Sequence, residues 1–440
     1  MNRYHKKTYK TDLNLLSEKT FFVFYNLCWK IAIPFLKRNP KLADGFNQRT
    51  LKKKLKPADL WIQSASAGEA YLVLEILKNL NLSKTITVLA TANTRQGVEI
   101  LEKAIAELTQ HNPNICLNAA FFPFDKPALM TKAVQMVKPK VMVLIETELW
   151  PGNLAALKAY GSKILILNGR INEKSLKGYL LWPSLWKTLA PDKILAISED
   201  NKQRFAALFG EKTADAMPNI KFDRISTFNG AHKTTNPLKP FLKPDADVLV
   251  LGSIRSAEEP LVKKIIVEVM RQRPNTIIGL FPRHMNRIET WKNELKRLSL
   301  NVVLRSKVLE EIPSGTVILW DIFGELGTAY GMAKACFVGG SLAPLGGQNF
   351  LEAITYGLIP VIGPFWDNFA WVGKEIMDQK LVHIGSDWKQ VADILVNHLK
   401  HPMDRSDVQQ AAQQYVSAHQ GGTTMACDLI RQYLKENQQQ

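Results

Sequence analysis

Short apolar runs alternate with helix-period patterns along most of the chain. Val141–Ile145 and Ile164–Leu167 are continuous apolar runs of strand length, whereas apolar residues recur at helical spacing around Val98–Leu108. Strands that alternate with helices in this way form a parallel sheet with right-handed crossovers. The alternation starts near Asp59, lapses near Asp223, and starts again at Val248. The pattern therefore predicts an α/β protein with two Rossmann-like domains.

Twelve apolar runs are the expected strands of these two sheets. In the first domain they are the segment ending at Trp61–Ile62, Thr85–Val88, Cys116–Phe122, Val141–Ile145, Ile164–Leu167 and Ile194–Ile197. In the second domain they are Val248–Leu251, Ile277–Phe281, Val302–Leu304, Val317–Leu319, Ala335–Val338 and Ile359–Ile362.

The length of 440 residues is enough for two domains that each bury a core. We expect an N-terminal arm over residues 1–58, a first domain over 59–222 and a second domain over 248–407. Residues 223–247 are rich in Pro, Lys, Asn and Thr and lack periodicity, which is typical of an interdomain linker. Residues 408–440 are predicted to form a C-terminal helix that can pack back on the first domain.

The arm is basic, and its apolar part is aromatic. Residues 1–58 hold 14 Lys and Arg against 3 Asp and Glu, which is 11 of the net 17 positive charges. Residues 21–36, FFVFYNLCWKIAIPFL, are interrupted by Lys30 and Pro34 and are too short for a spanning helix, and no signal-peptide cleavage site follows. Aromatic residues with basic flanks favour a helix lying in the inner face of a membrane. An amphipathic helix packed on the protein is the alternative. Nucleic acid is a poorer explanation, because no aromatic-interleaved binding motif accompanies the charge.

The composition argues against disulfide and metal sites. Hydrophobic residues make up 46% and charged residues 22%, an ordinary globular balance. The four cysteines have no CxxC spacing, which indicates a reducing compartment and argues against a disulfide framework or a zinc site. The eight histidines form no HExxH pattern. We therefore expect no metal.

The stretch WIQSASAGEAYL, residues 61–72, holds the first candidate for chemistry. A strand end is followed by a turn of small residues that includes Ser66 and Gly68, and then by Glu69 in the first turn of a helix. Such a turn presents free backbone N–H groups. A carboxylate there can face the crevice above the sheet, where open α/β folds bind ligands. A favourable interaction of Glu69 with the helix dipole is the alternative explanation.

Polar residues follow several strands of the first domain in the same manner. The carboxyl ends of parallel strands lie along one edge of a sheet, so these residues converge on one crevice, although some of them serve as helix caps. This argument places Glu148 and Arg170 at the crevice, and a purely structural Glu148–Arg170 pair is the alternative. The residues that follow the strands are Ser66, Glu69, Thr91, Glu146, Glu148, Asn168, Arg170, Ser198 and Glu199.

The second domain carries a set of groups suited to a nucleotide. Arg283 and His284 follow one strand, Gly324–Leu326 leads into a helix, and the glycine-rich loop of Gly346 and Gly347 opens another helix. Glycines before a helix N-terminus let backbone N–H groups approach a phosphate. No Walker A motif is present and no GxGxxG follows the first strand, so P-loop and dinucleotide sites are not indicated.

Ordered motifs along almost the whole chain resemble the transferases of 3-deoxy-D-manno-oct-2-ulosonic acid (Kdo) that act on lipid A precursors. The matching segments are WIQSASAGE at 61–69, IETELWP at 145–151, NGRINEKS at 168–175, NIKFD at 219–223, PRH at 282–284, DIFGEL at 321–326, FVGGSL at 337–342, and GGQNFLEA from Gly346 with the following GLIPVIGP. The basic, apolar arm also fits this family.

The resemblance implies the two-domain glycosyltransferase fold called GT-B, and an enzyme on the cytoplasmic side of the inner membrane. Its donor would be CMP-Kdo and its acceptor a hydroxyl of the lipid A precursor. The transfer would invert the anomeric centre without metal or other cofactor. Inner-membrane lipids, and not nucleic acid, would be its other partners. The resemblance implies Glu69 as the general base, which agrees with the need of a sugar hydroxyl for a positioned proton acceptor.

The implied sites divide between the two domains. Ser66, Gly68, Glu148 and Arg170 would lie on the acceptor or Kdo side. The residues implied for the CMP donor are Arg283, His284, Gly324, Glu325, Leu326, Gly346, Gly347, Asn349 and Glu352.

The sequence departs from the family pattern at three places. Gln348 stands where His is common, Ala353 stands where Pro is usual, and the segment GSIRSAEE at 252–259 lacks a common Ser-Thr-His. Gln donates a neutral hydrogen bond but carries no charge, so the donor contacts and the sugar itself stay open. The alternatives are another GT-B transferase with a different nucleotide sugar and a lipid acceptor, a nucleotide-sugar 2-epimerase of the same architecture, and a non-catalytic membrane adaptor.

Overall fold

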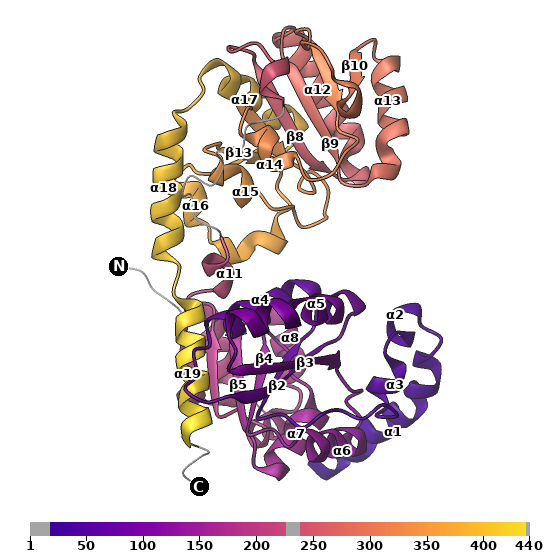
Figure 1. Cartoon of the computed structure of the whole chain (residues 1–440), viewed down its shortest axis with the longest axis vertical. Helices are drawn as coiled ribbons and strands as arrows, with labels where there is room; N and C mark the ends of the chain where they lie inside the picture. Colours follow the sequence, from indigo (N-terminus) through magenta and orange to yellow (C-terminus); the bar gives the residue numbers. More distant parts are fainter. Residues whose placement is uncertain (1–17, 226–237, 437–440) are drawn as a thin grey trace. The chain divides into compact units, whose positions relative to one another are not determined.

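The computed structural model describes residues 18–225 and 238–436, and the chain forms two compact units. Unit 1 comprises residues 1–224 together with 419–440, and unit 2 comprises residues 225–418. Figure 1 follows the chain through both units, with colours that run along the sequence. The expected arm before residue 18 and about half of the expected linker, residues 226–237, lie outside the described residues.

Unit 1 is built on a parallel sheet of seven strands in the order β3-β2-β1-β4-β5-β6-β7. Trp61 of the central strand pairs with Leu89 of β2 on one side and Met142 of β4 on the other. The chain runs outward from β1 in both directions, so the switch point of the topology lies between the ends of β1 and β4. The strands are β1 (Leu60–Ser64), β2 (Ile86–Ala92), β3 (Ile115–Phe121), β4 (Val141–Ile145), β5 (Lys163–Gly169), β6 (Lys193–Ala196) and β7 (Ala214–Ala216).

Every apolar run predicted as a strand in this part of the chain forms one. The short edge strand β7, with only three residues, was not predicted. Its segment, ADA, has no run of apolar residues from which a strand could be recognised.

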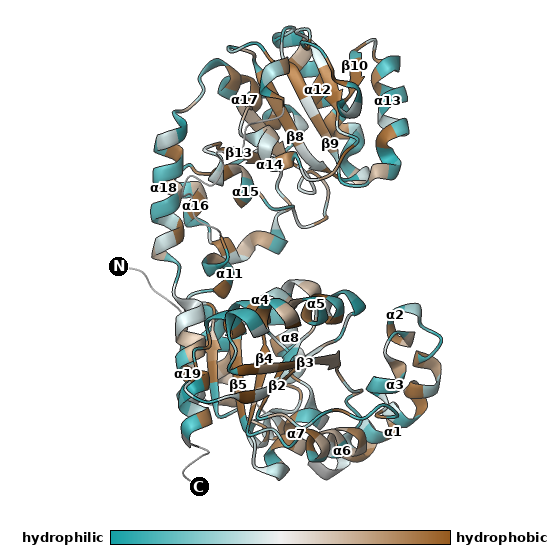
Figure 2. Cartoon of the chain, viewed as in Figure 1, coloured by the Kyte–Doolittle hydropathy of each residue, from teal (hydrophilic) through white to brown (hydrophobic). Residues whose placement is uncertain are grey.

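The sheet of unit 1 is covered by helices on both faces, and alternate strand residues supply the two cores. Leu60 and Ile62 pack under α4, α5 and α19, whereas Trp61 packs under the helices of the opposite face. Figure 2 shows mostly hydrophobic strands beside helices that carry both hydrophilic and hydrophobic residues. The helices that follow the arm are α4 (Ala67–Asn79), α5 (Arg95–His111), α6 (Pro127–Val137), α7 (Pro151–Tyr160), α8 (Glu173–Tyr179), α9 (Pro183–Thr188), α10 (Glu199–Phe209), α11 (Ile220–Asp223) and α19 (Gly422–Glu436).

The described part of the arm forms three helices that pack on unit 1, namely α1 (Glu18–Leu36), α2 (Pro40–Ala43) and α3 (Phe46–Arg49). One side of α1 faces the protein, where Phe21 packs edge-on against Trp182 with ring centroids 5.0 Å apart. The other side carries an exposed apolar stripe. Its members are Val23, Phe24, Leu27, Ile31 and Phe35, which are 50–71% exposed. Among the described helices, none is both long enough and apolar enough to cross a membrane.

Unit 2 is built on a second parallel sheet of seven strands, in the order β10-β11-β9-β8-β12-β13-β14. Its first strand, β8, lies between β9 and β12, so the switch point here lies between the ends of β8 and β12. The strands are β8 (Val248–Ile254), β9 (Ile277–Pro282), β10 (Asn301–Leu304), β11 (Thr316–Leu319), β12 (Ala335–Val338), β13 (Pro360–Ile362) and β14 (His383–Ile384). All six predicted runs form strands, and β14 is an addition.

The helices of unit 2 include short ones at the strand ends and long ones that cover the sheet. They are α12 (Glu259–Gln272), α13 (Ile288–Arg297), α14 (Leu326–Tyr330), α15 (Leu351–Thr355), α16 (Glu375–Asp378), α17 (Trp388–Lys400) and α18 (Arg405–Ala418). The single helix expected over residues 408–440 is wrong, because the segment holds two helices in different units. Residues 419–421 separate them, and Gly421 adopts a φ of +108° that interrupts a helix. Only α19 packs into unit 1.

Candidate functional site

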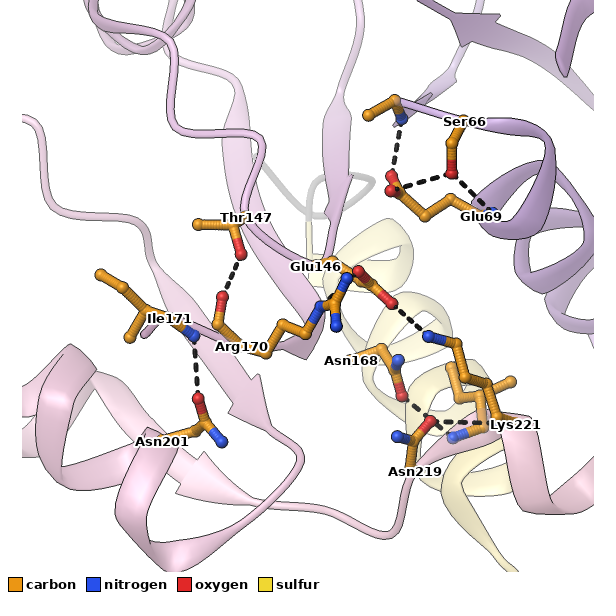
Figure 3. A network of polar contacts seen from close by, with 12 residues as sticks. Ser66, Glu69, Glu146, Thr147, Asn168, Arg170, Ile171, Asn201, Asn219 and Lys221 are labelled. Carbon is orange, nitrogen blue, oxygen red and sulfur yellow. Dashed lines mark hydrogen bonds and ion pairs between the residues drawn. The ribbon is translucent and has the colours of Figure 1, made fainter. Parts of the chain in front are cut away.

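Glu69 lies in the first turn of α4, shortly after β1, at the switch point of unit 1 (Figure 3). Its carboxylate accepts a hydrogen bond from the backbone N–H of Ala65 at 2.6 Å and one from the Ser66 hydroxyl at 3.2 Å. Ser66 also caps α4 by accepting the Glu69 N–H at 3.4 Å. A reciprocal cap of this kind fixes the turn and holds the Glu69 carboxylate in one place.

Burial raises the pKa of Glu69 to about 7, with the negative charges of Glu146 and Glu148 adding to the rise and the Ala65 N–H opposing it. A carboxylate that serves only as a helix cap gains from being ionised and keeps a low pKa. The raised pKa instead equips Glu69 to take and release a proton near neutral pH.

Gly68 leaves open space beside this carboxylate. A Cβ at Gly68 would meet only the Ser66 hydroxyl, at 3.8 Å, and the residue does not adopt a positive φ. Neither packing nor backbone conformation therefore demands glycine here. The missing side chain lets another molecule approach the start of α4.

Glu146 follows β4 and is held between two cations (Figure 3). Its buried carboxylate pairs with Arg170 Nε at 2.6 Å and with Lys221 Nζ at 2.7 Å. The Glu148–Arg170 pair considered from the sequence is therefore wrong, since Arg170 pairs with the other glutamate of the same loop. Half of the Arg170 side chain stays exposed, at 49%, so this cation can still meet a ligand.

Glu148 has different partners, all of them neutral. Its Oε2 accepts hydrogen bonds from Gln63 Nε2, Asn93 Nδ2 and Trp150 Nε1, each at 2.9 Å. The residue is only 8% exposed. A buried carboxylate fixed by three donors, without a cation beside it, carries a negative charge toward Glu69.

Two strand ends of unit 1 adopt backbone conformations that residues other than glycine seldom take. Glu146 has a φ of +58° and Asn168 a φ of +55°. The Asn168 side chain then accepts the Ile220 N–H at 2.9 Å, and Asn219 caps α11 by accepting the Lys221 N–H at 3.0 Å. These contacts bring Lys221 to Glu146 (Figure 3). Backbone strain of this kind gathers at functional sites.

The glycine-rich loop of unit 2 lies after β12, at the switch point of that sheet. Gly346 and Gly347 adopt φ values of +82° and +81°, which only glycine takes without strain. The Gly347 N–H bonds to the Gly340 carbonyl at 2.8 Å, and Asn349 Oδ1 accepts the Leu351 N–H at 3.2 Å where α15 begins. Glu352, in the first turn of α15, has its pKa raised by burial.

Arg283 and His284 follow β9 with exposed side chains. Gly324 adopts a φ of +88° before α14, which starts at Leu326. The Glu325 carboxylate, in contrast, is engaged by Arg305 at 2.8 and 3.0 Å and by Trp320 Nε1 at 3.0 Å. Any contact of Glu325 with a nucleotide would therefore come from its backbone.

Glu258 organises the loops of unit 2 and was not among the predicted site residues. It is fully buried, and its carboxylate accepts hydrogen bonds from the N–H groups of Gly340, Ser341 and Leu342. The segment GSIRSAEE, which departs from the family pattern, thus supplies the anion that fixes the loop after β12. These three N–H groups are occupied by Glu258.

Sequence reasoning also missed groups in unit 1. Gln63 is a polar residue inside an apolar strand, and this interruption was the available signal of a buried hydrogen-bonding role. Lys221 lies in the NIKFD motif, but no spacing rule joins it to Glu146, 75 residues away. Among the described residues no group of three or more His, Cys, Asp or Glu side chains is arranged to hold a metal ion.

Two units, each built on a parallel sheet, define the GT-B fold, which glycosyltransferases and nucleotide-sugar epimerases share. A glycosyltransferase from Rickettsia africae shares the fold with a TM-score of 0.55 and 13% identity, covering 86% of this chain and 99% of that one. The UDP-GlcNAc 2-epimerase of Neisseria meningitidis shares it with a TM-score of 0.54 and 14% identity, over 86% and 99% of the two chains.

Comparison of the sequence with known proteins shows which enzymes this chain resembles. Residues 43–224 match the family model of 3-deoxy-D-manno-octulosonic-acid transferase (kdotransferase). The 3-deoxy-D-manno-octulosonic acid transferase of Haemophilus influenzae is 24% identical over 87% of this chain and 88% of its own. A bifunctional glycosyltransferase/methyltransferase of Fusobacterium nucleatum is 29% identical over 81% of this chain, which spans 56% of that longer protein. The chain is a glycosyltransferase that resembles the Kdo transferases over most of its length, and its residues 43–224 match their family model.

Proposed function

We propose that this protein transfers Kdo from CMP-Kdo to a hydroxyl of a lipid A precursor, with Glu69 as the general base. The observation that carries the proposal is the Glu69 carboxylate, fixed in the first turn of α4 next to Gly68 and with its pKa raised to about 7. The similarity to Kdo transferases supports the sugar.

The reaction is a single inverting displacement. The acceptor hydroxyl attacks the anomeric carbon of Kdo and forms the new glycosidic bond, while its proton passes to the Glu69 carboxylate. The bond between the anomeric carbon and the CMP phosphate oxygen breaks, and the oxygen leaves with the electron pair. A base with a pKa near the working pH removes the proton most effectively as the bond forms.

The loops of unit 2 are suited to the nucleotide. Arg283 provides an exposed cation, and the left-handed glycines at 324, 346 and 347 allow backbone close to a phosphate. Glu352 at the start of α15 is a hydrogen-bond acceptor for ribose hydroxyls. His284, Leu326 and Asn349 border the same loops.

The acceptor and the Kdo carboxylate are assigned to unit 1. Arg170 is half exposed beside Glu146 and can meet an anionic group. Ser66 and Gly68 shape the space at the start of α4, and Glu148 lies in the same loop as Glu146. No metal is needed for the step, since proton transfer and leaving-group departure are served by these side chains.

The exposed stripe of α1 supports a place on the inner, cytoplasmic surface of the bacterial inner membrane. A contiguous apolar face on a helix seeks a partner, and Lys37, Arg38 and Lys41 are exposed just after this one. Basic groups next to an apolar helix face favour an anionic lipid surface. A lipid acceptor would then lie within reach of the enzyme. A soluble 2-epimerase would have no use for such a face.

The assignment is tested with the full-length protein, CMP-Kdo and a detergent-solubilised lipid A precursor, with the product followed by mass spectrometry. The account predicts a mass increase by whole Kdo units. Parallel reactions with UDP-sugars in place of CMP-Kdo test the rival transferase, and UDP-GlcNAc without acceptor tests the epimerase. Product from a UDP-sugar but none from CMP-Kdo would contradict the proposal.

A further inference from the structure

The N-terminal arm is joined to the Glu148 loop of unit 1 by two chains of buried and partly buried hydrogen bonds. The first starts at Tyr25, on the side of α1 that faces the protein. Its hydroxyl donates to Asp125 Oδ2 at 2.8 Å, and Asp125 is only 2% exposed. This is a specific polar contact in the middle of an aromatic interface, beside the packing of Trp29 on Phe124.

Asp125 also binds the first turn of α7, so it links Tyr25 to this helix. Its two carboxylate oxygens accept the N–H groups of Gly152 at 2.8 Å and Asn153 at 2.6 Å, in the first turn of α7. Trp150, the residue before the helix, supplies no side-chain cap of its own. A Cβ at Gly152 would lie 2.5 Å from the Asp125 carbonyl oxygen. Asp125 therefore determines where α7 begins.

The beginning of α7 in turn holds Glu148. Trp150 donates its indole N–H to Glu148 Oε2 at 2.9 Å, so a shift of the first residues of α7 shifts this donor. Residues 146–150 form one short loop between β4 and α7.

The second chain starts at Arg49, in α3. This arginine is 3% exposed, and its guanidinium donates to the carbonyl oxygens of Asn93 at 2.6 Å and Asp44 at 3.1 Å. It also lies over the ring of Phe121, 4.7 Å from the centroid. The Asn93 side chain donates to the same Glu148 oxygen at 2.9 Å. Two helices of the arm thus reach one carboxylate oxygen by independent routes.

We propose that Tyr25, Asp125 and Arg49 are positioning residues for Glu148, so that the seating of α1 on unit 1 sets the affinity for the acceptor sugar. This inference rests on the proposed function, because it takes Glu148 as an acceptor-side group. It gives the two faces of α1 separate tasks: the exposed stripe meets the membrane, and the face of Tyr25 adjusts the site.

The consequence is that the arm affects a reaction in which no membrane takes part. We would measure transfer from CMP-Kdo to a deacylated, water-soluble acceptor headgroup, with Tyr25→Phe, which removes one hydroxyl and leaves the ring packing. The expected result is a KM for the acceptor at least threefold higher, with kcat changed less than twofold. The matched control is Phe24→Ser on the exposed stripe, which should weaken binding to anionic vesicles and leave this KM unchanged.

A double-mutant cycle tests whether Tyr25 affects the acceptor KM through Glu148. In a Glu148→Gln background, Tyr25→Phe should change the acceptor KM by less than 1.5-fold, because the group it positions is already altered. An equal effect of Tyr25→Phe in both backgrounds, or no effect in the wild type, would overturn the inference.

A readout that needs no activity completes the test. The indole N–H resonance of Trp150, assigned by its loss in Trp150→Phe, should move in Tyr25→Phe and stay in Phe24→Ser. If the wild type makes no product, the proposed function fails, and this resonance still decides whether α1 positions the Glu148 loop. An unmoved resonance in Tyr25→Phe would overturn the coupling.

Discussion

At the scale of single residues, the chemistry of unit 1 depends on three carboxylates with three different environments. Glu69 is held by its own turn, Glu146 by two cations, and Glu148 by three neutral donors. The negative charges of Glu146 and Glu148 help to raise the pKa of Glu69. In the proposed mechanism, these differences in environment assign the role of the base to Glu69 and leave the other two carboxylates to bind and orient.

The pH dependence of transfer follows from this assignment. Glu69 must be ionised to accept a proton, and its pKa is about 7. The kcat/KM should therefore rise with pH, with a midpoint near 7, and should fall about tenfold per pH unit well below the midpoint. Initial rates at subsaturating acceptor between pH 5 and 9 measure this. A rate that is flat from pH 5 to 7 would exclude Glu69 as the base.

The charge of Glu146 should tune this midpoint in both directions. Lys221→Met removes one of the two cations that compensate Glu146, so the pKa of Glu69 should rise and the midpoint should move to higher pH. Glu146→Gln removes the negative charge, so the midpoint should move to lower pH. Both variants are compared by the same pH–rate profiles. Shifts of equal sign in the two variants would contradict the electrostatic account.

Much of the candidate site could be predicted from the sequence, because strand ends in a parallel sheet share one edge. Ser66, Glu69, Glu146 and Arg170 were all placed there by that argument alone. The pairing of Arg170 was not predictable, since Glu146 and Glu148 are separated by one residue and only the positive φ of Glu146 determines which side chain meets the arginine. The roles of Gln63 and Lys221 depend on contacts that no local pattern encodes.

At the scale of elements, the sequence predicted strands well and helix partners poorly. A buried parallel strand is a continuous apolar run, which is a signal carried by its own residues. The task of α1 depends on what it touches, and its sequence left two alternatives open. The described helix has features of both: Phe21 and Tyr25 pack on unit 1, while the stripe from Val23 to Phe35 is exposed.

The stripe of α1 should govern membrane binding. Leu27→Ser combined with Ile31→Ser removes two apolar side chains that are 50% and 59% exposed. Burying each such side chain in a membrane contributes about 1.5–3 kcal/mol, so partition onto anionic vesicles should fall by about tenfold or more. Vesicle sedimentation measures this, and Val267→Ser, on the exposed surface of α12, is the control. Unchanged sedimentation would remove the stripe from the membrane contact.

At the scale of the whole molecule, unit 1 is completed by the far end of the chain. The α19 residues Ala426, Cys427, Ile430 and Leu434 are buried in the same core as β1 and α4. Cys427 Sγ donates to the Ile76 carbonyl at 3.4 Å, across 351 residues of sequence. Periodicity could indicate this helix but not its break at Gly421 or the unit to which each half belongs, since both depend on contacts distant in sequence.

Truncation of Ile430 tests whether α19 completes the core of unit 1. Ile430→Ala removes a fully buried side chain and should lower the stability of unit 1 by about 2–5 kcal/mol. Hydrogen exchange should speed up in β1 and α4 and stay unchanged in β8 and α12. Lys435→Ala, at an exposed position of the same helix, is the control. Equal acceleration in both units would contradict the division of the chain.

The most direct test of the account compares wild type with Glu69→Gln. Each protein is incubated with CMP-Kdo and the lipid A precursor, the product is weighed by mass spectrometry, and CMP binding is measured by calorimetry. Glu75→Gln, on the same helix, is the control for the loss of a carboxylate. The account predicts Kdo addition by wild type and Glu75→Gln, a loss of rate of about 10²–10⁴-fold in Glu69→Gln, and equal CMP affinity in all three. Full activity of Glu69→Gln would contradict the central claim.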